Sequence, residues 1–193
     1  DGAMNSELKN AEDALLVERY RAGDEEAFEV LYDRYKTRIK AISHPYFLLW
    51  GDREDVVEEG VIGFVYAVNT FSRAGGASFR TYATTCIKAK ISTAIKRSMT
   101  DGNVALNKAK GYDAADETTF DPEYVVLMKE TIDNITGGLD GELSAFETEV
   151  LKKYLEGFGY DQISAQTGKN YKAVDNALQR AKKKIAERYE ENN

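Results

Sequence analysis

The sequence predicts an all-α protein of two small helical domains joined by a flexible acidic linker, the second domain being a helix-turn-helix. Apolar residues recur at helical spacing, and no stretch of useful length alternates as a strand would. Only two prolines occur among 193 residues, of which 31% are charged. A polar stretch with little periodicity, residues 101–121, divides the two periodic parts.

Four helices are predicted in the first domain, residues 7–100. Cap residues and helix breakers divide it into helices over 10–22, 25–43, 53–74 and 79–99. The predicted caps are Asp24, Asp52 and Ser78, and the predicted helix breakers are Gly23, Pro45, Gly75 and Gly76. The second predicted helix ends at Ser43, because proline disrupts a helix interior.

The second domain, residues 122–193, contains the predicted helix-turn-helix. Pro122 suits the first position of a helix, and "SAFE" at 144–147 forms a capping box. "GYDQISAQTGKN" then predicts a short helix, a tight turn at Gly168, and a long helix capped by Asn170. The linker before this domain, about 3.3 Å per residue when extended, would allow the two domains to stand well apart.

Charge is distributed unevenly along the chain, whose net charge is −7. Between Glu59 and Asp101 there is no Asp or Glu, whereas six Lys or Arg residues occur there. Residues 101–145 hold ten acids and three bases, and residues 169–188 hold seven bases and two acids. The two basic stretches are predicted to bind an anion such as nucleic acid, despite the acidic total.

Cysteine and histidine occur once each, as Cys86 and His44. A disulfide within the chain or a Cys/His zinc site is therefore not expected, and a cytoplasmic location is. No apolar run approaches the roughly 20 residues of a membrane span, so no membrane partner is expected. No set of nucleophile, base and orienting residue is evident, so neither enzymatic activity nor a metal or cofactor is predicted.

The long carboxyl-terminal helix has two distinct faces. Its predicted core face comprises Val174, Ala177, Leu178, Ala181 and Ile185. The opposite face carries Lys172, Asn176, Gln179 and Lys183, with Asp175 and Arg180 at its edges. Amides and cations suit base edges and phosphates in a major groove. The alternative is the solvated face of an ordinary helical hairpin.

The helix over 79–99 also has two faces. Ala83, Ile87, Ile91, Ala94 and Ile95 form its predicted core face, and Tyr82, Thr85, Ala89, Thr93 and Lys96 lie opposite. An exposed tyrosine on a basic surface without carboxylates suits single-stranded nucleic acid, on whose bases the ring can stack. The alternative is that Tyr82 packs on a neighbouring helix.

Two long segments resemble the bacterial RNA polymerase sigma factors of the sigma-70 family. They are "REDVVEEGVIGFVYAVNTFSRAGGASFRTYATTCIKAKISTAIK" and "LSAFETEVLKKYLEGFGYDQISAQTGKNYKAVDNALQRAKKKI". Together the matches cover most of residues 11–189. The spacing, with "VERYRAGDEEAFEVLYDRY", is most similar to the sporulation-type sigma-H branch of alternative factors. The resemblance implies a promoter-specificity subunit whose partners are the largest subunits of core RNA polymerase and promoter DNA, both duplex and single-stranded. It also allows an anti-sigma factor as a partner.

The resemblance implies a role for three groups of positions. The polymerase-binding group is Asp55, Glu58, Glu59, Val61 and Val65. The group for the −10 element is Phe71, Arg80, Thr81, Tyr82, Thr85, Lys88, Ala89, Ser92 and Lys96, of which Phe71, Thr81 and Tyr82 match positions that hold a flipped base. The group for the −35 element is Tyr171, Lys172, Asp175, Asn176, Gln179, Arg180 and Lys183. The chain departs from the housekeeping pattern at Thr85 and Cys86, where those factors carry two tryptophans that wedge the duplex.

Two other functions fit parts of the sequence. A free-standing helix-turn-helix regulator would bind duplex DNA without polymerase, but would not require the basic surface around Tyr82. A metal-dependent nucleic-acid enzyme would use the acidic residues of the third helix, with Glu58 or Glu59 as ligands, and would need divalent ions.

Overall fold

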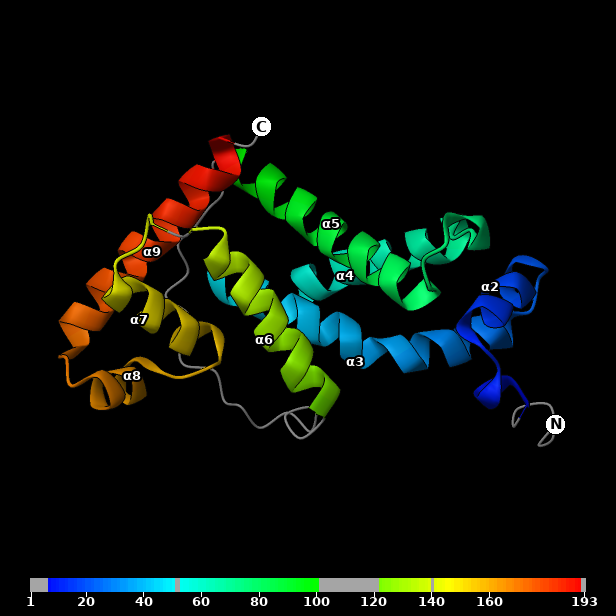
Figure 1. The fold of residues 1–193 in the computed structure, drawn as a ribbon, viewed down its shortest axis with the longest axis horizontal. Helices are drawn as coiled ribbons and strands as arrows, with labels where there is room; N and C mark the ends of the chain where they lie inside the picture. The colour runs from blue at the N-terminus through cyan, green and yellow to red at the C-terminus, as the bar shows by residue number, and fades with distance from the viewer. Residues whose placement is uncertain (1–6, 51–52, 101–121, 140, 192–193) are drawn as a thin grey trace.

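Helices form all the regular structure in residues 7–50, 53–100, 122–139 and 141–191, which are the residues described by a computed structural model. The predicted all-α class is confirmed, since no strand occurs in these ranges. The longer elements are α2 (Asp13–Arg21), α3 (Glu25–Trp50), α4 (Arg53–Thr70), α5 (Phe79–Thr100), α6 (Pro122–Gly137), α7 (Ala145–Leu155), α8 (Tyr160–Thr167) and α9 (Tyr171–Glu191) (Figure 1). A short 3-10 helix, η1 (Arg73–Gly75), lies between α4 and α5.

The predicted helix caps are present where the structure describes them. Backbone N–H groups donate to Asp24 before α3, to Ser78 before α5 and to Asn170 before α9, over 3.3, 3.2 and 2.9 Å. Ser144 and Glu147 form the reciprocal bonds of a capping box at α7. Each cap satisfies a donor that the first helical turn leaves without a partner. The predicted cap Asp52 lies outside the described residues.

Three predicted helix boundaries were wrong. The first long helix, α2, begins at Asp13 instead of residue 10. α3 continues through Pro45 to Trp50, because residues 41–46 are all buried and their packing offsets the backbone hydrogen bond that proline removes. α4 ends at Thr70, before the glycines, because Phe71 turns into the core and Ser72 caps η1.

Two glycines allow α4 and α5 to approach each other and α3 closely. A Cβ atom at Gly63 would lie 2.8 Å from both the carbonyl oxygen of Cys86 and the Cα of Ile87. A Cβ atom at Gly60 would lie 2.9 Å from Ile39 Cγ2 on α3. The close approach of Gly63 to Cys86 and Ile87 sets how near α5 lies to α4.

Aromatic rings fill the centre of the amino-terminal helices. Phe64 on α4 is fully buried, and its ring centroid lies 5.2 Å from that of Tyr35 and 6.2 Å from that of Phe79. The Tyr35 hydroxyl donates to Asp13 and so ties α3 to the start of α2. These contacts hold the beginning of α5 against both helices.

The carboxyl-terminal helices pack on one another and on the amino-terminal half. α9 packs against α7 and α8, while α6 lies across α3 (Figure 1). The end of α5 also contacts α9, and the buried apolar side chains form one cluster from α2 to α9. The predicted linker lies outside the described residues, so the division into domains 7–100 and 122–193 stays a prediction.

Candidate nucleic-acid and polymerase interfaces

The face of α9 predicted to read DNA is directed away from the core. The predicted core face is confirmed, because each of its five side chains is at most 1% exposed. Gly168 forms the turn before α9 with a φ of 66°, a left-handed conformation that glycine adopts without strain. On the opposite face Tyr171, Lys172, Asn176, Arg180 and Lys183 are exposed, and Asp175 and Gln179 are half-buried.

Glu147 anchors this helix, a role that the sequence did not reveal. Its buried carboxylate accepts hydrogen bonds from Arg180 at 2.7 Å and Lys184 at 2.8 Å, in addition to its capping bond. Burial alone would raise the pKa of Glu147, but the bonds from Lys184, the Ser144 backbone and Arg180 outweigh it and lower the pKa to about 2. Arg180, predicted to contact DNA, therefore also holds α9 against α7.

Lys182 is a second feature of α9 that was not predicted. Its side chain is buried, and its ammonium nitrogen lies 4.6 Å from the centroid of the Tyr154 ring. Burial lowers the pKa of Lys182 to about 8. The signal was in the sequence, because Lys182 lies four residues after Leu178 and next to Ala181 on the apolar side of the helix.

The basic face of α5 is only partly open to solvent. Arg80, Thr81, Thr85 and Ala89 are exposed, whereas Lys88, Ser92 and Lys96 are half-buried. Arg80 pairs with Glu123 at 2.9 Å and Lys88 with Glu130 at 3.1 Å, both acids being on α6. Two of the predicted DNA-binding cations therefore have carboxylate partners in this conformation.

The predicted exposed tyrosine, Tyr82, packs on the end of α4. Its side chain is half-buried, its hydroxyl lies 3.0 Å from the Thr70 hydroxyl, and its ring centroid lies 5.8 Å from that of Phe71. Phe71 is itself buried between Tyr82 and Phe79. The packing alternative thus describes Tyr82 here, and its role with a flipped base stays a prediction.

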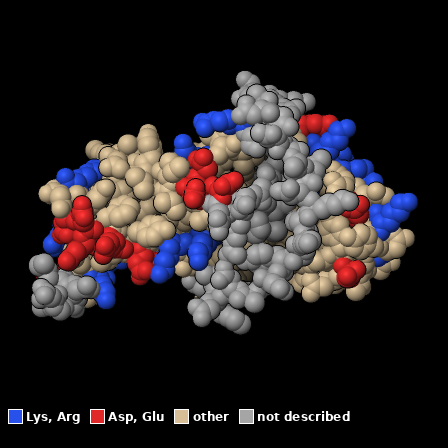
Figure 2. Space-filling view, turned by 180° about the vertical axis from the view of Figure 1, so that it is seen from behind, with Lys and Arg blue, Asp and Glu red and all other residues tan. Residues whose placement is uncertain are grey.

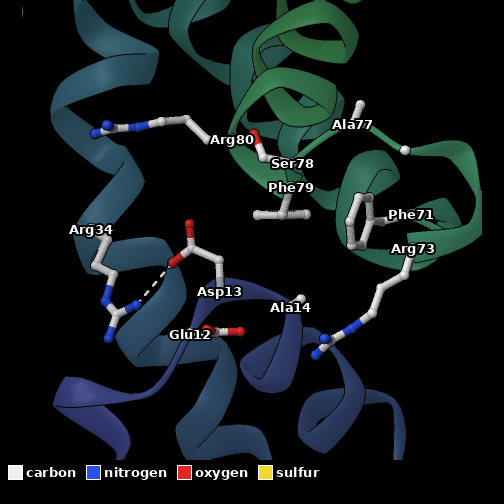
Figure 3. A pocket seen from close by; sticks show the side chains of 11 residues that line it. Glu12, Asp13, Ala14, Arg34, Phe71, Arg73, Ala77, Ser78, Phe79 and Arg80 are labelled. Carbon is white, nitrogen blue, oxygen red and sulfur yellow. Dashed lines mark hydrogen bonds and ion pairs between the residues drawn. The ribbon is translucent and has the colours of Figure 1, made fainter.

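A pocket of about 590 Å³ lies beside Phe71 (Figure 3). The rings of Phe71 and Phe79 and the hydroxyl of Ser78 line it, together with the carboxylates of Glu12 and Asp13. Three arginines, Arg34, Arg73 and Arg80, stand at its periphery. Arg34 pairs with Asp13 at 2.8 Å and Arg73 with Glu18 at 2.9 Å. Thr81 and Tyr82 are not among the residues that line this pocket.

The outward face of α4 combines acidic and apolar side chains. Asp55 and Glu58 are exposed as predicted, whereas Glu59 turns toward Lys90 on α5, 3.9 Å away. Val61 and Val65 are half-buried, while Ile62 and Tyr66, which were not predicted, are 49% and 58% exposed. Their spacing from Glu58, four and eight residues, could have identified them. α4 passes behind α5 in Figure 1, and the reversed view in Figure 2 shows a broad uncharged area bordered by both acidic and basic side chains.

A metal site has no support in the described ranges. No group of three His, Cys, Asp or Glu side chains there lies close enough to hold an ion. Among the same residues, no helix combines the length and the apolarity needed to cross a bilayer.

Comparisons with known proteins identify the family. Residues 31–100 match the family model of sigma-70 region 2, and residues 147–185 match that of sigma-70 region 4. The RNA polymerase sigma-H factor of Bacillus subtilis is 34% identical over 200 residues, covering 95% of this chain and 92% of that protein. The chain belongs to the sigma-70 family of sigma factors.

A second relative of this sigma factor is equally similar in sequence. The RNA polymerase sigma-H factor of Bacillus licheniformis is 34% identical over 90% of this chain and 85% of its own. The solved structure of the RNA polymerase sigma-H factor from Fusobacterium nucleatum is 27% identical, with a TM-score of 0.30 over 72% of this chain and 95% of that one. Within this sigma factor, region 2 includes α4 and α5, region 4 includes α8, and α6 lies between the two matched segments.

Proposed function

We propose that this sigma factor directs core RNA polymerase to promoters through three surfaces, on α4, α5 and α9. The observation that carries the proposal is that region 2 and a region 4 helix-turn-helix with exposed cations and amides occur in one chain. The chain would act in the cytoplasm, as a non-catalytic subunit. A partner of the anti-sigma type stays a prediction of the family resemblance.

The polymerase-binding surface would be the outward face of α4. Ile62 and Tyr66 supply apolar area that is costly to leave in water, and Asp55 and Glu58 add charges that orient a basic partner. Buried apolar or aromatic anchors surrounded by polar residues are the usual centre of a stable protein interface. Val61, Val65 and Glu59 would position these anchors rather than contact the partner.

The pocket beside Phe71 would hold an unstacked base of the −10 element. Its two phenylalanine rings offer apolar surface for a base, and Ser78 offers a hydrogen-bonding group. The peripheral arginines would exchange their present carboxylate partners for phosphates. Stacking of a base on an aromatic ring contributes about 1–3 kcal/mol, which helps to offset the cost of unpairing it. Thr81, Thr85 and Ala89 would follow the strand along α5.

The −35 surface would be the exposed face of α9. Lys172 and Lys183 suit phosphates, while Asn176 and Gln179 have the amide groups that read base edges in the major groove. Arg180 would contact DNA with the nitrogens that it does not use to bind Glu147.

The test is a titration of fluorescently labelled protein with bacterial core RNA polymerase. A Glu58→Ala/Ile62→Ala variant should bind about 10-fold more weakly or worse, because two central interface residues are truncated. The matched control, Val126→Ala/Glu149→Ala, removes one exposed apolar and one exposed acidic side chain from other helices, and should bind like the wild type. If the wild type ignored polymerase but bound duplex DNA, the chain would act as a free-standing regulator.

A further inference from the structure

α6 places its acidic side chains on the cations of the amino-terminal half. Glu123 Oε1 accepts from Arg80 of α5 at 2.9 Å and also from the buried Arg38 of α3. Two helical turns further on, Glu130 pairs with Lys88 at 3.1 Å. The two carboxylates therefore neutralise a row of cations in the stretch from Glu59 to Asp101 that has no acid of its own.

The remainder of this contact is apolar. Tyr124, Leu127 and Met128 of α6 are buried, and the Tyr124 hydroxyl lies 3.0 Å from His44 Nδ1 on α3. Val126, on the outer side of α6, is 64% exposed. α6 is thus an amphipathic helix seated on α3 beside the basic face of α5 (Figure 1).

We propose that α6 is an intramolecular competitor of DNA, whose two carboxylates take the place of phosphates on Arg80 and Lys88 until α6 moves away. This inference rests on the proposed function, in which the same face of α5 follows the −10 strand. When only a fraction of the molecules is in the binding-competent state, the apparent affinity is reduced in proportion to that fraction. The free sigma factor would therefore bind DNA weakly, and any partner that draws α6 away would make Arg80 and Lys88 available to phosphates.

The ion pairs of Arg80 and Lys88 with α6 are weak enough to be replaced by contacts with phosphates. Side chains of Glu123 and Glu130 are 42% and 55% exposed, and Lys88 is 25% exposed. Ion pairs with such access to water are weak and are screened by salt. Arg80 and Lys88 can consequently change a carboxylate for a phosphate at little cost. The buried Arg38 would lose its carboxylate partner and keep its hydrogen bond to Thr84.

A Glu123→Gln/Glu130→Gln variant of the full chain tests the competition. The probe is a fluorescein-labelled single-stranded oligonucleotide of mixed sequence, titrated with free protein at low ionic strength. We expect this variant to bind about 3-fold to 10-fold more tightly than the wild type, since the carboxylates that compete with phosphates for Arg80 and Lys88 are removed. The matched control, Glu149→Gln/Glu156→Gln, makes the same change in net charge at exposed positions of α7 and its C-cap, and should change the affinity less than 2-fold.

The outcomes separate this proposal from the proposed function. An equal gain in both variants would reflect net charge alone, and no gain would mean that α6 does not compete; either result overturns the proposal. Amide hydrogen exchange gives a second readout: saturating DNA should speed exchange in α6 of the wild type, and unchanged protection there also overturns it. Binding of core polymerase is measured in parallel. If neither the wild type nor any variant bound polymerase, that result would contradict the proposed function and not the competition by α6.

Discussion

At the scale of single residues, Glu147 connects the fold to the DNA-reading face. Its folded pKa of about 2 lies below the ordinary value of 4.5, so the stability it contributes is present above about pH 4.5 and is lost as the pH falls toward 2. Glu147→Gln should lower the free energy of unfolding by about 2 kcal/mol at pH 7. Urea denaturation at pH 7 and pH 3 measures this loss, which should be smaller at pH 3.

Glu149→Gln provides the control for that measurement. Glu149 is exposed on the same helix, so its replacement should change the unfolding free energy by less than about 0.5 kcal/mol. If both variants were equally stable at pH 7, the ion pairs of Glu147 would contribute nothing to the fold.

The charge of Lys182, unlike that of Glu147, is expected to lower the stability of the fold. Its folded pKa of about 8 lies below the ordinary value of 10.5, so stability should rise with pH between about 8 and 10.5. Lys182→Met keeps an unbranched side chain one atom shorter and removes the buried charge, and should raise the free energy of unfolding at pH 7 by about 1 kcal/mol. The gain should shrink as the pH approaches 10; a destabilised variant would mean that the contact with Tyr154 outweighs the cost of burial.

The sequence pattern predicted the buried side chains better than it predicted the ion pairs. The core positions of α9 follow from helical spacing, because one face must meet the neighbouring helices. The partners of Arg180 and Arg80 do not follow from the sequence, since Glu147 and Glu123 are 33 and 43 residues away along the chain. Only tertiary packing brings those charges together.

At the scale of helices, the contact between α4 and α5 depends on the absence of a side chain at Gly63. Gly63→Ala would place a methyl group against the backbone of Cys86 and Ile87 and force the helices apart. The cost of this overpacking exceeds the gain in helix propensity, so we expect a net loss of about 1–2 kcal/mol in thermal or urea unfolding. Gly137→Ala, where a Cβ atom meets nothing within 4 Å, should be nearly neutral.

The base-reading role of α9 can be tested separately from the stability of the fold. Asn176→Ala should change the preferred −35 sequence by about 1–3 kcal/mol at one base pair, because it removes an exposed amide without altering the core face. Selection of promoters from a randomised library by reconstituted holoenzyme measures this preference. Unchanged selected sequences, in a variant that folds normally, would exclude Asn176 from base reading.

Helix order and caps could be predicted, while some boundaries could not. Asp24, Ser78, Ser144 and Asn170 act locally through their own side chains, so the sequence was sufficient. The passage of α3 through Pro45 depends on the buried contacts of residues 41–46, which local propensity does not include. Similarly, the end of α4 depends on the burial of Phe71.

At the scale of the whole molecule, the two halves share one apolar cluster, and α6 joins them. If the ion pairs of α6 hold it against α3 and α5, Glu123→Gln/Glu130→Gln should make the chain more extended at low salt than the wild type. Small-angle X-ray scattering should then give a larger radius of gyration for this variant, with the difference diminishing as salt screens the pairs in the wild type. Identical scattering curves would mean that apolar packing alone fixes the arrangement.

The spacing of the charges on α6 also fixes its register. Glu123 and Glu130 are seven residues apart, and their partners Arg80 and Lys88 are eight apart, so both pairs close only at one alignment of the helices. A slide by a single turn, about 5.4 Å, would carry both carboxylates past their partners. A slide of α6 along α5 would therefore break both ion pairs together. In the proposed competition, Arg80 and Lys88 would thus become available to promoter DNA in a single step.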